Sequence, residues 1–137
     1  MEYRAILFHK QSTSARLRFL RFANDSVCAF APIPALAQAH ANQSQNPVLH
    51  PAPVLKRLED ELGFESGTLR AEEGFRYSVE VTNEKIQVLL VAIVSMDPPF
   101  DQAEKIGAEF IDLTQARGLP GVELDLLRGA YELVLGG

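Results

Sequence analysis

The spacing of apolar and polar residues divides the chain into short strands and two helices. Residues 75–82 alternate apolar with polar side chains, which predicts a strand buried on one face. The continuous apolar run over 86–94 instead predicts a strand buried on both faces, at the centre of a mixed sheet. Further strands are expected at residues 3–8, 16–22, 27–31 and 110–113.

Two segments have helical spacing. Within residues 51–62 the apolar side chains fall within about 100° of arc, which predicts a helix with one buried face and with Leu58 and Leu62 in the core. Gly63 suits the position that follows the helix. A second helix is expected from Gly121, and it should be largely covered, since few of its residues are polar. Residues 35–50 have weak periodicity and predict a long loop.

Length and composition indicate one globular domain spanning residues 1–137, and the predicted strands and helices make it α+β. The 137 residues are 47% apolar and 23% charged, as is usual for a globular protein. The longest apolar runs are far shorter than a membrane span, the N-terminus does not resemble a signal peptide, and a single cysteine, Cys28, allows no internal disulfide. The expected location is the cytoplasm, with no membrane partner.

Charge is unevenly distributed along the chain. The net charge is −5, although residues 1–22 contain five basic side chains and one acidic side chain. A general basic surface for nucleic acid is therefore not expected. Arg16 and Arg18 alternate with apolar residues and are candidates for binding a phosphate group, although solubilising arginines on a strand face would give the same pattern.

Residues 56–64 carry a motif with the order Lys-Arg-Leu-Glu-Asp-Glu-Leu-Gly-Phe. This segment resembles the second half of the Nudix box, Arg-Glu-hydrophobic-x-Glu-Glu-x-Gly-hydrophobic. The positions that match outright are Leu58, Glu61, Gly63 and Phe64. Lys56 and Asp60 are conservative replacements, whereas Arg57 reverses the charge of a family glutamate.

The first half of the box does not match. Its glycine and glutamate would fall on Asn42 and Val48, and residues 35–50 contain neither glycine nor an acid. The order of the predicted elements nevertheless resembles the family along the whole chain. The fold that the resemblance implies is an α+β Nudix-like α/β/α sandwich, with a mixed sheet, a box helix and a C-terminal helix.

The resemblance also suggests a chemistry. Nudix enzymes hydrolyse nucleoside diphosphates linked to another group, and carboxylates of the box helix hold the Mg²⁺ that they need. Here Asp60 and Glu61 are the candidate metal ligands and catalytic residues, and Arg57 shares their helix face. Its guanidinium is expected to pair with both carboxylates where a metal would bind. The leading hypothesis is thus a non-catalytic module without a cofactor, which binds a small phosphate-containing ligand or a protein partner; a homodimer is left open.

Three alternatives stay open at this point. The first alternative is that the chain is a divergent Mg²⁺-dependent hydrolase, in which Asp60 and Glu61 work with a further acid from Glu65, Glu72 or Glu104. Or residues 57–61 are an ordinary solvated helix face with pairs that stabilise only weakly. Or the half-box is accidental and the domain is an unrelated α+β fold. The histidines at positions 9, 40 and 50 have no metal-ligand spacing and are expected in loops.

Overall fold

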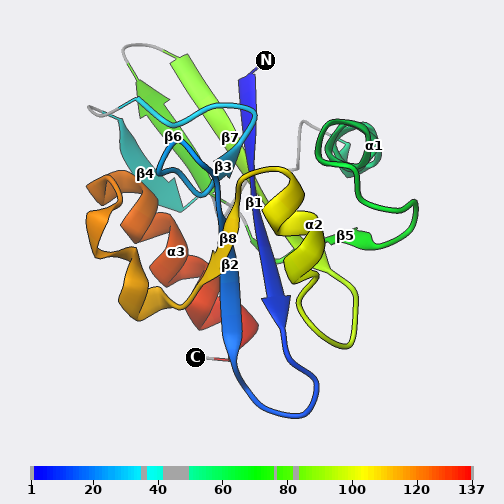
Figure 1. The fold of residues 1–137 in the computed structure, drawn as a ribbon. Helices are drawn as coiled ribbons and strands as arrows, with labels where there is room; N and C mark the ends of the chain where they lie inside the picture. Colours follow the sequence, from blue (N-terminus) through cyan, green and yellow to red (C-terminus); the bar gives the residue numbers. More distant parts are fainter. Residues whose placement is uncertain (1, 35–36, 42–49, 76, 82–83, 137) are drawn as a thin grey trace.

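A computed structural model describes residues 2–34, 37–41, 50–75, 77–81 and 84–136, and all structural statements refer to these residues. The fold is α+β, with a mixed sheet and several helices (Figure 1). The strands are β1 (Glu2–Lys10), β2 (Leu17–Arg21), β3 (Cys28–Ala29), β4 (Gln38–Ala41), β5 (Leu69–Ala71), β6 (Tyr77–Val81), β7 (Glu84–Ile93) and β8 (Glu109–Ile111). The helices are α1 (Pro51–Leu62), α2 (Phe100–Lys105), the 3₁₀ helix η1 (Leu113–Gly118) and α3 (Gly121–Val134).

The sheet is built around the pair β1 and β7. Its strand order is β4-β6-β7-β1-β2-β8, with β3 paired to β1 and β5 paired to β7. β1 and β7 run parallel, with Ala5 beside Leu89 and Phe8 beside Ala92, and the other pairs are antiparallel. The predicted central strand over residues 86–94 is confirmed, because β7 has neighbours on both sides. Val94 follows its end and is exposed.

The alternation of side chains along β1 and β7 produces two apolar cores. Ile6, Phe8 and Leu90 face the core that includes Leu126 and Leu127 of α3. The alternate residues of the same strands face a second core, which includes Val54 and Leu58 of α1 and Ala103 of α2. Accordingly α1 and α2 cover one face of the sheet and α3 covers the other (Figure 1).

Helix α1 has the bounds that the sequence predicts. Two prolines suit its first turn, and Gly63 ends it in the left-handed conformation (φ 75°), with its N–H donating to the Glu59 carbonyl at 2.9 Å. Leu58 is fully buried, as predicted. Leu62 is only partly buried, since it lies at the last turn, where the helix leaves the sheet.

Several elements differ from the sequence-based prediction. Within the segment expected to be a loop, β4 forms a strand because it pairs with β6, and residues 35–36 and 42–49 lie outside the described residues. Helices α2 and η1 were not predicted; both are short, with six residues each. The strand expected over 27–31 is only Cys28–Ala29, because Phe30 has a left-handed backbone (φ 81°) that cannot continue it.

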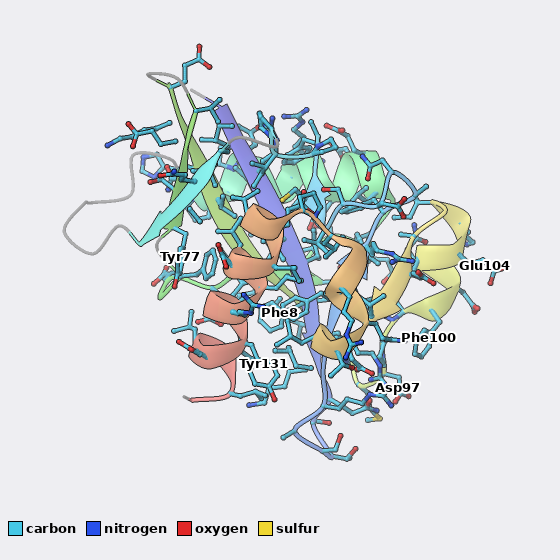
Figure 2. All side chains as sticks on the ribbon, turned by 90° about the vertical axis from the view of Figure 1, so that its left-hand side faces the viewer. Phe8, Tyr77, Asp97, Phe100, Glu104 and Tyr131 are labelled. Atoms are coloured by element: carbon cyan, nitrogen blue, oxygen red, sulfur yellow. The ribbon has the colours of Figure 1, made fainter. Side chains whose placement is uncertain are left out.

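Helix α3 begins at Gly121, as predicted, and Val122, Leu126 and Ala130 are buried. Leu133, in the last turn of the helix expected to be largely covered, is 39% exposed. Tyr77 of β6 packs beside α3, and a Cβ at Gly129 would lie 2.5 Å from its hydroxyl oxygen (Figure 2). A larger residue at position 129 would therefore force this contact apart. None of the helices in the described part of the chain has the length and apolarity that crossing a membrane requires.

Candidate functional site

Asp60 and Glu61 of α1 each pair with a cation one helical turn earlier. The Lys56 ammonium donates to Asp60 at 3.1 Å, and Arg57 Nε donates to Glu61. The prediction that Arg57 pairs with both carboxylates is therefore wrong for Asp60, because the i,i+4 spacing places Lys56 beside it. All four side chains are 45% exposed or more. Such pairs at the surface stabilise the helix only weakly.

Arg57 differs from Lys56 in what else it contacts. Its guanidinium carbon lies 3.9 Å from the centroid of the Phe30 ring and 5.7 Å from that of Tyr3. Its Nη1 also donates to the Tyr3 hydroxyl at 3.2 Å. We call Tyr3, Phe30, Arg57 and Glu61 the Arg57 cluster. The hydrogen bond to Tyr3 and then the one to Glu61 raise the pKa of Arg57 further above its usual value, so this charge is permanent.

Phe30 reaches the cluster through an unusual backbone. Its φ of 81° lies in the left-handed region, which a bulky residue seldom adopts. The ring meets Tyr3 edge-on, with centroids 5.4 Å apart and an interplanar angle of 88°. This backbone conformation ends β3 and places the Phe30 ring beside Arg57 of α1. Local strain of this kind is found where surrounding contacts hold a residue in place.

The acids of the alternative metal site are not brought together. Glu104 lies on the outer side of α2 (Figure 2), and Glu72 lies near Leu133 and Val134 of α3, across the sheet from α1. Glu59 accepts a hydrogen bond from the Gly67 amide at 3.0 Å. Among the described residues there is no group of three His, Cys, Asp or Glu side chains that could hold a metal ion.

Arg16 and Arg18 do not form a common site with the Arg57 cluster. Arg16 lies just before β2 and donates two hydrogen bonds to Asp112, at 3.0 and 3.2 Å, and this carboxylate raises its pKa. Arg18 donates to the Gln11 side chain at 2.8 Å and lies 5.8 Å from the centroid of the Phe100 ring. Arg16 is therefore neutralised by a carboxylate, and Arg18 is held by a neutral partner.

His9 is not the loop histidine that the sequence suggested. It is fully buried within β1, because it takes an inward-facing position of that strand. Its Nε2 is 2.8 Å from the Ser95 carbonyl oxygen, while Nδ1 is buried without a hydrogen-bond partner. The contact ties β1 to the segment that follows β7. His50 precedes α1 and is exposed.

A buried carboxylate was missed by the sequence analysis. Glu123, in the first turn of α3, is fully buried and accepts hydrogen bonds from the Ser26 hydroxyl at 2.8 Å and the Val27 amide at 3.0 Å. The Ser26 oxygen in turn accepts from the Cys28 amide at 3.0 Å. Burial first, and the Glu123 charge second, raise the pKa of the Cys28 thiol above its usual range. The only sequence signal was an acid flanked by apolar residues in a largely covered helix.

No family model matches this chain, and no curated protein matches it. The Nudix resemblance therefore rests on residues 56–64 and on the order of the elements.

Proposed function

We propose that this chain is a Nudix-like domain whose box helix holds no catalytic metal, and that it binds a small phosphate-containing ligand without hydrolysing it. The observation that carries the proposal is the position of Arg57. It replaces the family's glutamate, pairs with Glu61 and stacks on Phe30. Two helices on one face of the mixed sheet and one on the other agree with an α/β/α sandwich of Nudix type.

Electrostatics supports a site without metal. A divalent cation 4 Å from a guanidinium is repelled by about 2 kcal/mol in bulk water, and by more where water is partly excluded. The ion pairs themselves are weak, so they would yield to a strongly bound metal. The missing ligands matter more: Mg²⁺ needs several hard oxygens, and the described residues contain no group of three His, Cys, Asp or Glu side chains that could hold the ion.

Calorimetric titration with Mn²⁺ tests the proposal. We expect a Kd weaker than about 1 mM, because one ligand position is cationic and the described residues form no group of three metal-binding side chains. A panel of nucleoside diphosphate derivatives, assayed with Mg²⁺, should show no turnover above background. The Lys56→Gln variant is titrated in parallel. It removes a neighbouring cation and leaves the Arg57 cluster intact, so it controls for the general effect of positive charge on Mn²⁺ binding. Micromolar Mn²⁺ affinity or metal-dependent turnover would instead establish the divergent hydrolase.

A further inference from the structure

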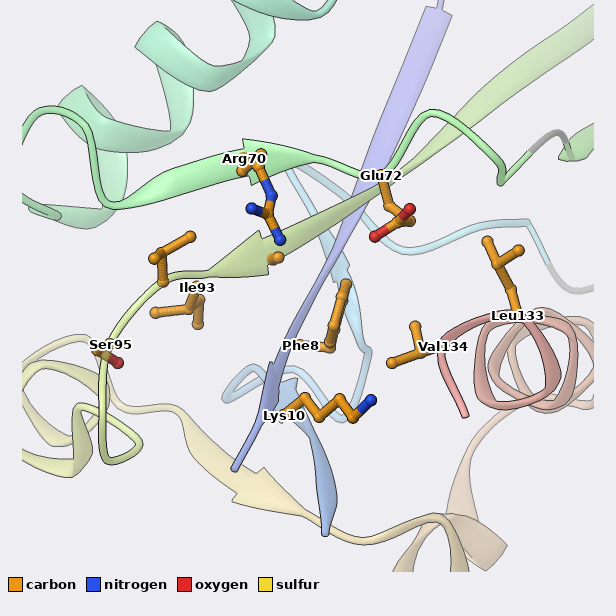
Figure 3. Close-up of a pocket in the computed structure, with 10 residues that line it drawn as sticks. Phe8, Lys10, Arg70, Glu72, Ile93, Ser95, Leu133 and Val134 are labelled. Atoms are coloured by element: carbon orange, nitrogen blue, oxygen red, sulfur yellow. The ribbon is translucent and has the colours of Figure 1, made fainter. Parts of the chain in front are cut away.

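A hollow of about 380 Å³ opens where α3 ends over the sheet (Figure 3). It lies on the face opposite α1, at the carboxyl ends of the parallel strands β1 and β7. The residues that line it are Phe8, Lys10, Arg70, Glu72, Ala92, Ile93, Val94, Ser95, Leu133 and Val134. Its volume is at the lower end of the range of small-molecule pockets, and ligands of α/β sheets commonly bind at such strand ends.

The register of three strands explains the floor of the hollow. Arg70 of β5 pairs with Ala92 of β7, and Ala92 pairs with Phe8 of β1, so the three residues form one row across the sheet. The small side chain in the middle of this row leaves space above β7. The last turn of α3 borders that space through Leu133 and Val134 (Figure 3). Phe8 and Ala92 in this floor are buried, and the exposed apolar side chains of the lining are Val94 and Leu133.

Two cations border this floor. Arg70 lies in the row itself, and Lys10 lies two residues beyond Phe8 on the same face of β1 (Figure 3). Within the described part of the chain, neither has an ion pair or side-chain hydrogen bond, whereas Arg16, Arg21 and Arg57 each pair with a carboxylate. Glu72 is the one acid among the lining residues. The hollow is therefore locally positive in a chain whose net charge is −5.

We propose that this hollow binds a small amphipathic anion, a phosphate monoester or carboxylate attached to an apolar body. The apolar body would lie against Val94 and Leu133, the exposed apolar side chains of the lining, which removes apolar surface from water. The anionic head would pair with the Arg70 guanidinium, which matches phosphate and carboxylate oxygens in pairs, and Lys10 at the other end of the hollow would add positive potential (Figure 3). This inference rests on the ligand-binding part of the proposed function and gives it a site, and it needs no metal at α1.

Titration with n-hexyl phosphate, followed by amide chemical shifts in a buffer with EDTA, tests the site. We expect a Kd on the order of 1 mM, with shifts concentrated at residues 8–10, 70–72, 92–95 and 133–134. Inorganic phosphate and 1-hexanol should each bind at least about tenfold more weakly, because each supplies only half of the recognised chemistry. Hexanoate is the parallel arm: tighter binding of hexyl phosphate identifies a phosphate site, and tighter binding of hexanoate identifies a carboxylate site.

Charge variants distinguish binding in the hollow from a general attraction of the anion to positive charges on the protein surface. Lys10→Gln and Arg70→Gln should each weaken hexyl phosphate binding by roughly fivefold, the modest loss expected for partly solvated contacts. Glu72→Gln should tighten it by roughly threefold, because the repelling carboxylate is removed. Lys105→Gln and Arg117→Gln, which make the same charge change at exposed positions outside the hollow, should leave the Kd unchanged.

Three outcomes would overturn the inference. If hexyl phosphate at a concentration tenfold above the expected Kd causes no amide shifts, or causes them only away from the hollow, the hollow binds no such anion. Equal affinity for inorganic phosphate would show that the apolar side chains of the lining are not used. Indifference to both Lys10→Gln and Arg70→Gln would show that the cations are not the recognising groups. Since EDTA is present throughout, failure here is distinct from failure of the proposal that α1 holds no metal, which the Mn²⁺ titration decides separately.

Discussion

The guanidinium carbon of Arg57 lies 3.9 Å from the centroid of the Phe30 ring, and Arg57 stands where the Nudix box, which residues 56–64 resemble, would have glutamate. This contact and the pair with Glu61 give Arg57 a structural role that a carboxylate could not take. A ring face attracts a cation and repels an anion. Phe30 and Glu61 are thus both matched to the positive charge of Arg57. Replacing Arg57 by the glutamate of the Nudix box is therefore the most informative substitution.

Arg57→Glu should lower stability without metal and raise the response to metal. The variant loses a cation–π contact and places three acids on one helix face, which together should cost about 1 kcal/mol of unfolding free energy. It also adds a hard oxygen beside Asp60 and Glu61. If Mg²⁺ then binds, a concentration ten times its Kd adds about 1.4 kcal/mol. Urea unfolding with and without Mg²⁺ measures both effects.

The control for this variant is Lys56→Glu. It makes the same change of charge one residue earlier, at a side chain that has no aromatic contact among the described residues. A Mg²⁺ response of Arg57→Glu alone would support a Nudix-like orientation of the helix face. If neither variant, or both equally, gains stability from Mg²⁺, residues 57–61 are an ordinary solvated face.

Phe30→Gly should be more stable than Phe30→Ala. Both variants lose the ring that contacts Arg57 and Tyr3, so the comparison isolates the backbone. At φ 81° an alanine retains the steric strain of its Cβ, and glycine does not, a difference of about 1 kcal/mol. Chemical unfolding of the two variants measures it directly. Equal stability, or a more stable alanine variant, would mean that the backbone at position 30 does not keep this conformation.

Periodicity was a reliable guide wherever local spacing and burial agree. Residues 51–62 form α1 because the apolar stripe, the prolines and Gly63 all favour the same helix. The run 86–94 became the inner strand β7 because only a strand buried on both faces can accommodate so many consecutive apolar residues. The strand β4 was missed because its polar sequence, Gln-Ala-His-Ala, has no strand pattern of its own and is extended through its pairing with β6.

The candidate site was less predictable, because its contacts join residues far apart in the chain. Spacing along α1 could place Arg57 near Glu61, but nothing in the sequence places Phe30 or Tyr3 beside it. The same holds for Glu123, whose partner Ser26 lies 97 residues earlier. The hollow that Arg70 lines depends on the register of β5, β7 and β1, which the sequence does not specify.

Glu123→Ala should be among the most destabilising single changes in the chain. It leaves the Ser26 hydroxyl and the Val27 amide without their buried acceptor, which should cost about 3 kcal/mol of unfolding free energy. Ser26→Ala should cost less, because the Val27 amide still donates to the carboxylate. The double variant should be more stable than the sum of the two losses indicates. Asp125→Ala, at an exposed site of the same helix, should stay within about 0.5 kcal/mol of the wild type.

Cys28 should make the stability of the folded chain decrease in alkaline solution. Burial and the Glu123 charge raise the folded pKa of its thiol, whereas the unfolded chain has the usual value of 9.0. Below that pH the thiol is protonated in both states and contributes no pH dependence. Above it, the unfolded chain releases the proton and the folded chain retains it, so unfolding is favoured by about 1.4 kcal/mol at pH 10. The wild type should therefore lose this amount relative to Cys28→Ala between pH 8 and pH 10, because all other titrating groups are common to both proteins. Urea unfolding of the pair at each pH measures the difference, and parallel curves across this range would mean that the Cys28 thiolate is tolerated in the folded core.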